Sequence, residues 1–307
     1  MKDIITLSGD IGSGKSSVTG CLANDISFDV VGTGKIQRSI AEKRGMTTLE
    51  LNKVSQTDRS IDDEIDSYVV NLGKTRHRLI VDSRLAWHFI PESFKVFLSV
   101  DPCIGAERVF AASRSDENNA SVASAFDNNM HRQGLEDERF RKLYGINFRE
   151  YQNYDLVIDT SFSSPEAIAT KIKSCFDLWL ANQPYAKLWF NPQRLIPTRP
   201  VRRCIGSDYD IVFNAISESA FDAACPVDVF VHSGFVYLWD GHKRVIASKK
   251  SGIDLIPARL LSEAVDCDLA AERTATSVAN GIDVSLLHDW EQALGFTFKR
   301  YPEKVDF

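Results

Sequence analysis

The sequence predicts an α/β fold in two parts, a doubly wound first half with a five-stranded parallel sheet and a smaller α+β second half. A glycine-rich loop near residue 10 lies between an apolar strand and a helical pattern. Short apolar runs then alternate with helical patterns as far as residue 181, where prolines and a hairpin pattern replace them. With 307 residues, the chain suits a first domain over 1–181, a linker over 182–194 and a second domain over 195–307.

The strongest local pattern is Gly9-Asp10-Ile11-Gly12-Ser13-Gly14-Lys15-Ser16, which matches G-x-x-x-x-G-K-S. Residues 4–7 form an apolar strand before it, and a helical pattern follows it. Such a loop aims backbone N–H groups at phosphate oxygens, and the helix start adds partial positive charge. Lys15 should reach the β/γ-phosphates, and the Ser16 hydroxyl should hold Mg²⁺. The candidate ATP-binding residues of this loop are Gly9, Gly12, Ser13, Gly14, Lys15, Ser16 and Ser17.

The rest of the first half reads as parallel strands and their connecting helices. Candidate strands cover 4–7, 28–31, 79–82, 95–100 and 155–159, and most are apolar runs that end in a polar or small residue. The last helix should begin after a Ser164 cap, with Pro165 in its first turn. This alternation is typical of a doubly wound sheet.

The second half has a different pattern. Pro192, Pro197 and Pro200 lie within nine residues and exclude a regular helix or central strand there. Runs at 227–231 and 235–239 flank His232-Ser233-Gly234, which predicts a hairpin. A helix over 241–250, a strand over 255–261 and a helix over 285–294 complete the prediction.

The composition of the chain argues against a nucleic-acid or membrane partner and against secretion. The net charge of −6 does not favour a nucleic-acid or membrane partner, although a local basic patch stays open, and no oligomeric state is indicated. Six cysteines without a C-x-x-C pair read as buried thiols and not as disulfides or a zinc site. The start resembles no signal peptide, and no apolar run is long enough to cross a membrane. We therefore expect a cytoplasmic protein.

Several stretches of residues 1–180 resemble the cytidylate kinase family of nucleoside monophosphate kinases, in its short archaeal-type branch. The matching segments follow in family order with family spacing, at 8–17, 32–38, 45–52, 61–66, 81–86 and 154–160. The resemblance implies a P-loop kinase with a mobile lid. It also implies ATP and Mg²⁺ as cofactors and a small-molecule nucleotide as substrate.

Two groups of arginines could supply the positive charge that phosphoryl transfer needs. Arg38 and Arg84 follow the second and third strands, and ligands bind at the carboxyl ends of such strands. The resemblance assigns both to the acceptor phosphate, which guanidinium forks suit.

The second group of arginines flanks a polar stretch at 113–129. The resemblance makes this stretch the lid, with Arg132 and Arg139 on its returning helix and Arg108 as an ATP contact. We place Lys15, Arg84, Arg132 and Arg139 in the catalytic set. The alternative for a lid arginine is pairing with neighbouring acidic residues on a solvated helix.

Acidic residues and one lysine complete the candidate acceptor site. Asp82 ends the third strand, where it would orient Mg²⁺ through water or hydrogen-bond the phosphate loop. Asp62 and Asp66 share one helix face. They either contact the nucleoside or form a solvated acidic surface. Lys35 stands where many relatives have an acidic residue, which weakens the case for plain CMP as the acceptor.

Residues 190–265 resemble the ParB/sulfiredoxin-like fold, which includes ParB nucleotide-binding domains and free serine kinases. The segments 195–198, 236–247 and 256–260 carry the resemblance. The turn at the helix start suits a phosphate, with the candidate residues Asp240, Gly241, His242, Lys243 and Arg244. Serine kinases of this fold have a catalytic glutamate after their Pro-Thr pair, whereas Arg199 follows here. His242 is either a general base or a turn histidine bonded to the backbone, and Asp240 is an alternative helix cap.

The leading hypothesis is an ATP- and Mg²⁺-dependent kinase of a pyrimidine nucleoside monophosphate of the CMP or dCMP type. Its second domain would bind a nucleotide or the substrate. One alternative is a hydroxyl acceptor, such as a hydroxymethyl pyrimidine in DNA or free serine. The other is a nucleotide-dependent switch or binding module without catalysis.

Overall fold

The computed structural model describes residues 3–47, 50–51, 54, 58–112, 120–205, 209–219, 225–262, 268–270 and 273–299. The first part of the predicted lid, residues 113–119, lies outside these ranges, as does Cys267. No described helix is both long and apolar enough to span a membrane.

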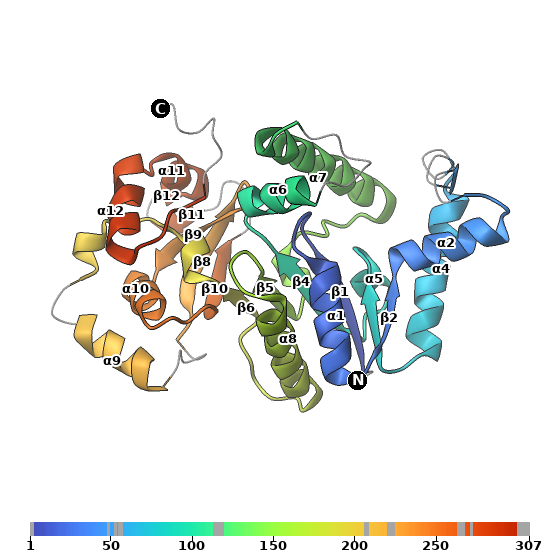
Figure 1. The fold of residues 1–307 in the computed structure, drawn as a ribbon, viewed down its shortest axis with the longest axis horizontal. Helices are drawn as coiled ribbons and strands as arrows, with labels where there is room; N and C mark the ends of the chain where they lie inside the picture. Colours follow the sequence, from blue (N-terminus) through green and yellow to red (C-terminus); the bar gives the residue numbers. More distant parts are fainter. Residues whose placement is uncertain are drawn as a thin grey trace.

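The first half alternates strands and helices in the predicted order (Figure 1). Its elements are β1 (Ile4–Gly9), α1 (Lys15–Ile26), β2 (Asp29–Gly32), α2 (Thr33–Lys43), α4 (Ser60–Thr75), β3 (Leu79–Asp82), α5 (Ala86–Phe89), β4 (Phe94–Ser99), α6 (Pro102–Ala111), α7 (Val122–Tyr144), η1 (Tyr151–Asn153), β5 (Leu156–Asp159) and α8 (Pro165–Leu180).

Five parallel strands form the centre of this half, in the order β2-β3-β1-β4-β5. Helices α1 and α8 cover one face and bury residues such as Val18 and Ile172, while α2, α4 and α5 pack on the other. All six residues of β1 are buried, because helices cover both of its faces. The predicted five-stranded parallel sheet is therefore confirmed, and the Ser164 cap and Pro165 begin α8 as expected.

The second half adds strands to the same sheet. Its elements are β6 (Leu188–Phe190), η2 (Pro192–Arg194), β7 (Ile196–Pro197), η3 (Val201–Arg203), α9 (Tyr209–Ser219), β8 (Val227–His232), β9 (Phe235–Asp240), α10 (His242–Lys250), β10 (Ile256–Ser262), β11 (Asp268–Ala270), β12 (Arg273–Thr274), α11 (Ala275–Asn280) and α12 (Val284–Leu294). The predicted hairpin, its helix and the following strand are present as β8, β9, α10 and β10.

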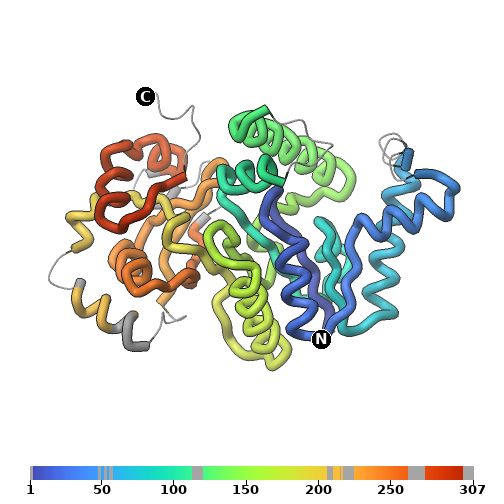
Figure 2. Tube along the Cα trace, viewed as in Figure 1, coloured from blue at the N-terminus to red at the C-terminus, as the bar shows by residue number. Residues whose placement is uncertain are grey.

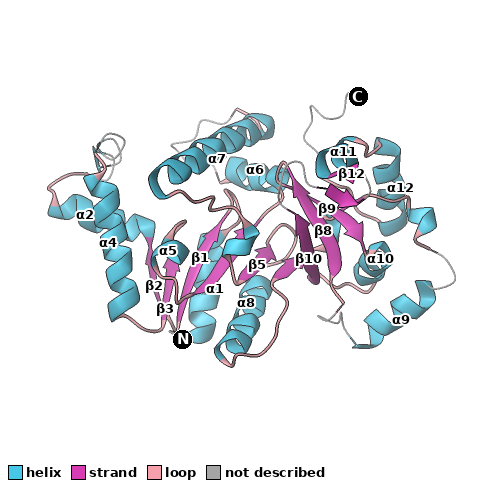
Figure 3. Ribbon diagram, turned by 180° about the vertical axis from the view of Figure 1, so that it is seen from behind, coloured by secondary structure: helices cyan, strands magenta, loops and turns pink. Residues whose placement is uncertain are grey.

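The segment 182–194 is part of the sheet, which corrects its prediction as a linker. It contains β6, which pairs in parallel with β5 and antiparallel with β10. The sheet therefore runs without interruption across both halves, in the order β2-β3-β1-β4-β5-β6-β10-β8-β9-β7 (Figure 3). A strand of three residues between Pro184 and Pro192 is too short to show a periodic pattern in the sequence.

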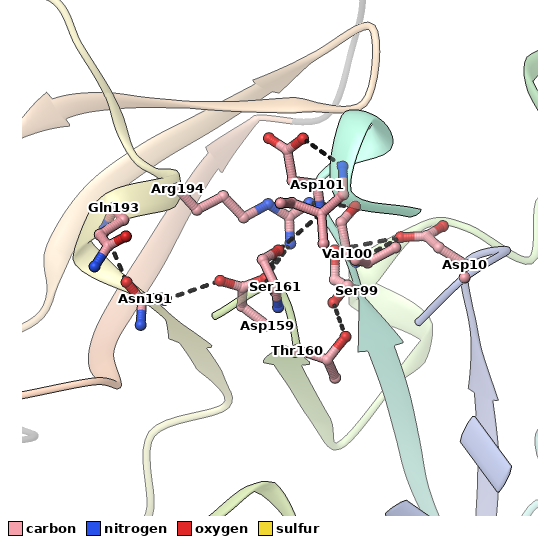
Figure 4. A network of polar contacts seen from close by, with 12 residues as sticks. Asp10, Ser99, Val100, Asp101, Asp159, Thr160, Ser161, Asn191, Gln193 and Arg194 are labelled. Carbon is pink, nitrogen blue, oxygen red and sulfur yellow. Dashed lines mark hydrogen bonds and ion pairs between the residues drawn. The ribbon is translucent and has the colours of Figure 1, made fainter. Parts of the chain in front are cut away.

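A shared core joins the two halves, which lie side by side along the chain trace (Figure 2). One hydrophobic cluster contains Phe97 and Tyr154 of the first half together with Val227 and Trp290 of the second. A buried ion pair crosses the same boundary, with Arg194 Nη1 2.8 Å from Asp159 Oδ1 (Figure 4). Both side chains are at most 1% exposed, so each charge depends on the other for compensation.

Five cysteines lie in the described part of the chain, and none of them forms a disulfide. Cys103, Cys175 and Cys204 are buried, as predicted, but Cys225 is exposed and Cys21 is half-buried. The expectation that the thiols are buried therefore fails at Cys225.

Candidate active site

The loop between β1 and α1 has a backbone that only glycine accommodates. Gly12 has φ 80°, and a Cβ there would lie 2.4 Å from the carbonyl oxygen of Gly105. Gly14 has φ 73° and stands as the residue before α1. Both values lie in the left-handed region that glycine adopts without steric cost. The close approach of α6 to the loop thus depends on two glycines, Gly12 in the loop and Gly105 in α6.

Polar groups of this loop are left without protein partners. The Ser13 hydroxyl is buried and makes no hydrogen bond. Ser16 and Ser17 are exposed, and neither side chain has a partner in the described chain. The Lys15 ammonium has one long contact, with Nζ 3.4 Å from the carbonyl oxygen of Gly9. Unsatisfied donors around a helix start are suited to binding an anion.

The electrostatics of Lys15 point to the same conclusion. Burial, with a smaller contribution from nearby Arg84, lowers the pKa of Lys15 to about 8, although Asp82 and Asp10 oppose the shift. The protein by itself therefore disfavours the charged form of this ammonium. An anionic phosphate beside Nζ would restore the charged form.

Three arginines from different elements converge on one carboxylate of α7. Arg84 Nη1 lies 2.6 Å from Glu136 Oε1, and Arg132 Nε lies 3.2 Å from the same oxygen. Arg149 Nη2 lies 3.6 Å from Glu136 Oε2. Arg84 follows β3, Arg132 is on α7 and Arg149 follows α7, so the cluster exists only in the folded chain. One carboxylate thus holds three guanidinium groups together, and Asp10 and Asp137 also pair with Arg149.

Arg149 links this cluster to the phosphate loop, and sequence reasoning missed it. Its Nη1 donates to Asp10 Oδ1 at 2.7 Å, and its Nε donates to Asp137 Oδ1 at 3.1 Å. The guanidinium also lies 4.4 Å from the centre of the Phe148 ring. Nothing local marks Arg149, because it follows a helix and precedes η1 without a recognisable motif. Its partners are more than ten residues away in the sequence.

Arg139, which was predicted to be catalytic, has a different position. Its Nη2 donates to both carboxylate oxygens of Asp62 on α4, at 2.9 and 2.7 Å. One turn further along α4, Asp66 accepts a hydrogen bond from Tyr144 at 2.8 Å. Burial raises the pKa of Asp66 to about 6. Arg139 thus joins α7 to α4, and Arg149 contacts the phosphate loop instead.

The remaining predicted arginines and Lys35 divide between two places. Lys35 and Arg38 are exposed on α2, and neither side chain contacts a described partner. Arg108 on α6 lies against the phosphate loop, with Nη1 3.3 Å from Gly12 O. Its Nη2 donates to the carbonyl oxygens of Thr160 and Ser161 at 2.7 and 3.0 Å. Arg108 therefore bridges the phosphate loop and the loop after β5.

A polar network extends from the phosphate loop to the second half (Figure 4). Asp10 Oδ2 accepts hydrogen bonds from the backbone N–H of Val100 at 3.2 Å and from the Ser99 hydroxyl at 3.4 Å. Arg194 donates to the Val100 carbonyl oxygen at 3.1 Å. The ends of β4 and β5 thus connect the loop at Asp10 to the buried ion pair between Arg194 and Asp159.

The oxygen ligands predicted for Mg²⁺ are available. The Ser16 hydroxyl and the Asp82 carboxylate have no side-chain partner within the described ranges. Burial raises the pKa of Asp82, while Lys15 and Arg84 oppose that effect. Hydroxyl and carboxylate oxygens are the ligand class that Mg²⁺ takes. The residues present therefore fit the cation.

The predicted phosphate site of the second half has the same local backbone. Gly241 has φ 96° and precedes α10. His242, however, is 4% exposed, and its Nε2 accepts a hydrogen bond from the Thr198 backbone N–H at 3.3 Å. Arg244 Nη1 donates to the carbonyl oxygens of Cys225 and Pro226, at 2.6 and 2.7 Å.

These contacts favour the backbone-bonded interpretation of His242. Burial, with Arg199 nearby, lowers the pKa of His242 to about 4, although Asp240 opposes the shift. Arg244 Nη2 also lies 3.5 Å from Asp240 Oδ2. The protein therefore takes up the Arg244 guanidinium and His242 Nε2, while His242 Nδ1 is buried without a partner, and a phosphate site there stays a prediction.

Comparison with known proteins places the first half among kinases. A family model described as the cytidylate kinase-like family matches residues 4–162. A cytidylate kinase of Natronomonas pharaonis is 32% identical over 178 residues, which are 57% of this chain and 90% of that protein. A cytidylate kinase of Methanocella arvoryzae is 36% identical over 174 residues, which are 57% of this chain and 97% of that protein.

A third relative carries the same unit in a longer chain. The S-adenosylmethionine-dependent nucleotide dehydratase of Lacinutrix mariniflava is 35% identical over 173 residues, which are 56% of this chain but 35% of that protein. The family match leaves residues 163–307 outside it. The resemblance predicted for residues 190–265 stays a prediction.

Proposed function

The chain belongs to the cytidylate kinase-like family, and we propose that it is an ATP- and Mg²⁺-dependent kinase of pyrimidine nucleoside monophosphates of the CMP or dCMP type. The phosphate loop would bind the triphosphate of ATP. The acceptor would bind between that loop and the helices α2 and α4. The phosphoryl group would pass directly from ATP to the acceptor, without a covalent enzyme intermediate.

One observation carries this proposal, the cluster of Arg84, Arg132 and Arg149 around Glu136 beside Lys15. Phosphoryl transfer proceeds with negative charge spread over the transferred group, so catalysis depends on positioning and on cations. Guanidinium groups bind phosphate oxygens through paired hydrogen bonds. Glu136 holds the three arginines in place beside the phosphate loop, where guanidinium groups would pair with the oxygens of a bound phosphate.

Residues of the phosphate loop and of the arginine cluster would have different roles in phosphoryl transfer. Lys15 and the N–H groups of residues 12–16 hold the transferred phosphoryl group, and Ser13 supplies a buried hydroxyl. Arg84 and Arg132 would stabilise the charge that develops on it. Arg149 is a positioning residue, because it fixes Asp10 of the loop and the Glu136 cluster together.

Ser16 and Asp82 would hold Mg²⁺, and Arg108 would flank the bound ATP. Bound Mg²⁺ supplies neutralisation of the phosphate charge. Arg108 already fixes the turn at Gly12 against the loop after β5, which keeps the phosphate-binding N–H groups in position.

The acceptor side rests on α2 and α4. Lys35 and Arg38 project from α2 without described partners, so both remain available to an acceptor phosphate. The Arg139–Asp62 pair connects α4 to the lid helix α7, so closing the lid and binding the acceptor would be linked. Closure also excludes water, which limits ATP hydrolysis.

A transfer assay with γ-labelled ATP tests the proposal. The acceptors would be CMP, dCMP, UMP, AMP, free serine and single-stranded DNA that contains a hydroxymethyl pyrimidine. We expect CMP or dCMP to have the highest kcat/KM, and Arg38→Met to raise the acceptor KM with little change in the KM for ATP. Label that enters only serine or DNA would contradict the proposed acceptor, and loss of ATP affinity in Arg38→Met would contradict the assignment of this arginine.

A further inference from the structure

A large cavity lies between the lid helix and the second half of the molecule. Its volume is about 1230 Å³. Helix α7 and the segment after it form one wall, and the turn between β8 and β9, with the end of β10, forms the other. One wall therefore comes from residues 227–262, which lie outside the family match.

Helix α7 presents different side chains to this cavity and to the phosphate loop. Asn129, Gln133 and Asp137 recur every four residues, share one face and line the cavity. Arg132 and Glu136 lie on a neighbouring face and pair with each other, and Glu136 also pairs with Arg84. The cavity face of α7 thus differs from the face that carries Arg132 and Glu136, although the cavity reaches Arg149 and Asp10 of the phosphate loop.

Three uncharged polar groups line the cavity without a protein partner. Asn129 is 8% exposed, and its amide makes no hydrogen bond with the described part of the chain. The Gln133 amide, one turn away, likewise has no described partner. Across the cavity, His232 Nδ1 is buried and unpaired. Asn129 is buried, whereas Gln133 is half-buried. A buried polar group without a partner is costly, which indicates that a ligand or ordered water completes the hydrogen bonds of the Asn129 amide.

The chemistry of these groups selects a class of ligand. The two amides, Asn129 and Gln133, each offer a donor and an acceptor but no charge. Of the arginines that line the cavity, Arg149 already contacts Asp10, Asp137 and Glu136, and Arg259 pairs with Asp228. Phe126 and Met130 add apolar surface next to the amides. This combination fits a planar heterocycle whose edge carries both donors and acceptors.

We propose that this cavity binds a nucleobase, with Asn129 and Gln133 reading its hydrogen-bonding edge and the His232 ring forming part of the opposite wall. Amide side chains pair with base edges through simultaneous donor and acceptor bonds. The base could belong to a free nucleoside or nucleotide or to a single-stranded nucleic acid, because the recognising chemistry is the same.

Calorimetric titration of the full chain with adenosine, guanosine, cytidine and thymidine tests the proposal. Nucleosides lack phosphates and so avoid the charges of the phosphate loop. We expect at least one to bind, and near-isosteric Asn129→Leu or Gln133→Met to weaken it by about tenfold or more. Asn128→Leu is the matched control, because Asn128 is exposed on the same helix and does not line the cavity.

Two further measurements separate the outcomes. Binding should survive in Lys15→Ala, so this result does not depend on the kinase activity. Anisotropy with a labelled single-stranded oligonucleotide distinguishes a polynucleotide from a free base, and a signal that Asn129→Leu removes supports the former source. The proposal fails if neither nucleosides nor the oligonucleotide bind, if both amide variants bind like wild type, or if Lys15→Ala removes the binding.

Discussion

Two helix starts in this molecule look alike locally and differ in what surrounds them. At α1, Gly14 in the left-handed region precedes Lys15, and at α10, Gly241 in the same region precedes His242 and Lys243. Both turns follow a strand, and both place basic residues at a helix N-terminus, which favours anions.

The difference lies in how far the protein itself uses the polar groups. At α1, the Ser13 hydroxyl has no partner, and Lys15 has one contact of 3.4 Å. At α10, Arg244 makes two short bonds to carbonyl oxygens, and His242 accepts from the Thr198 backbone. A strand–glycine–helix turn is therefore not enough to identify an anion site, and the partners of its side chains decide which polar groups remain for an anion.

The largest expected effect separates the two turns by function. Lys15→Ala should lower kcat/KM for phosphoryl transfer by about 100- to 1,000-fold, because a preorganised charge on the transferred group is lost. The unfolding transition should change little, since Lys15 has one weak protein contact. Steady-state kinetics and thermal unfolding check this, with the exposed α8 variant Lys173→Ala as control. Near-normal turnover in Lys15→Ala would remove this loop from the reaction.

A pH effect on stability should come from α10. The folded-state pKa of His242 is about 4, below its ordinary value of 6.5, so folding favours the neutral ring. The contribution of this neutral ring to the free energy of unfolding is complete above pH 6.5. It is lost as the pH falls toward 4, and the loss is about 2 kcal/mol at pH 5. Urea unfolding at pH 7, 6 and 5 measures it. The loss should shrink in His242→Gln, and identical pH slopes in both proteins would contradict the assignment.

Lys15 should give a pH effect on binding instead. Because its pKa is about 8 and phosphate favours the charged form, ATP binding should take up a proton near pH 8. Affinity should then fall as the pH rises, by up to about tenfold between pH 8 and 9. Calorimetry in buffers of different ionisation enthalpy detects the proton. Lys15→Arg, which stays charged, should lose the dependence, and proton release on binding would contradict the prediction.

The smallest expected effect comes from Arg244. Arg244→Met removes the donor to the Cys225 and Pro226 carbonyl oxygens and should cost about 1 kcal/mol of unfolding free energy. Phosphoryl transfer should be unchanged, which reverses the pattern of Lys15→Ala. Urea unfolding and the transfer assay check both halves of this statement. A large loss of transfer with unchanged stability would show that the α10 turn binds a reactant after all.

Local patterns predicted much of the fold because they depend on neighbouring residues. Buried parallel strands read as apolar runs, and the Ser164 cap with Pro165 marks the start of α8. The hairpin around His232-Ser233-Gly234 was equally visible, as was the phosphate loop. In each of these cases, the sequence pattern and the element that it predicts lie within about twenty residues of each other.

What the sequence by itself determined is therefore the parallel strands and helices of the first half, the hairpin and helix of the second, the phosphate loop and the kinase family to which the first half belongs. Only the tertiary structure decided that β6 joins both halves into one sheet, because a three-residue strand is specified by its neighbours β5 and β10. It also decided that Arg149 and not Arg139 contacts the loop, and that Arg244 is taken up by backbone carbonyls. Hydrogen bonds and ion pairs join whichever groups the fold brings within about 3 Å, and no spacing along the chain encodes that choice.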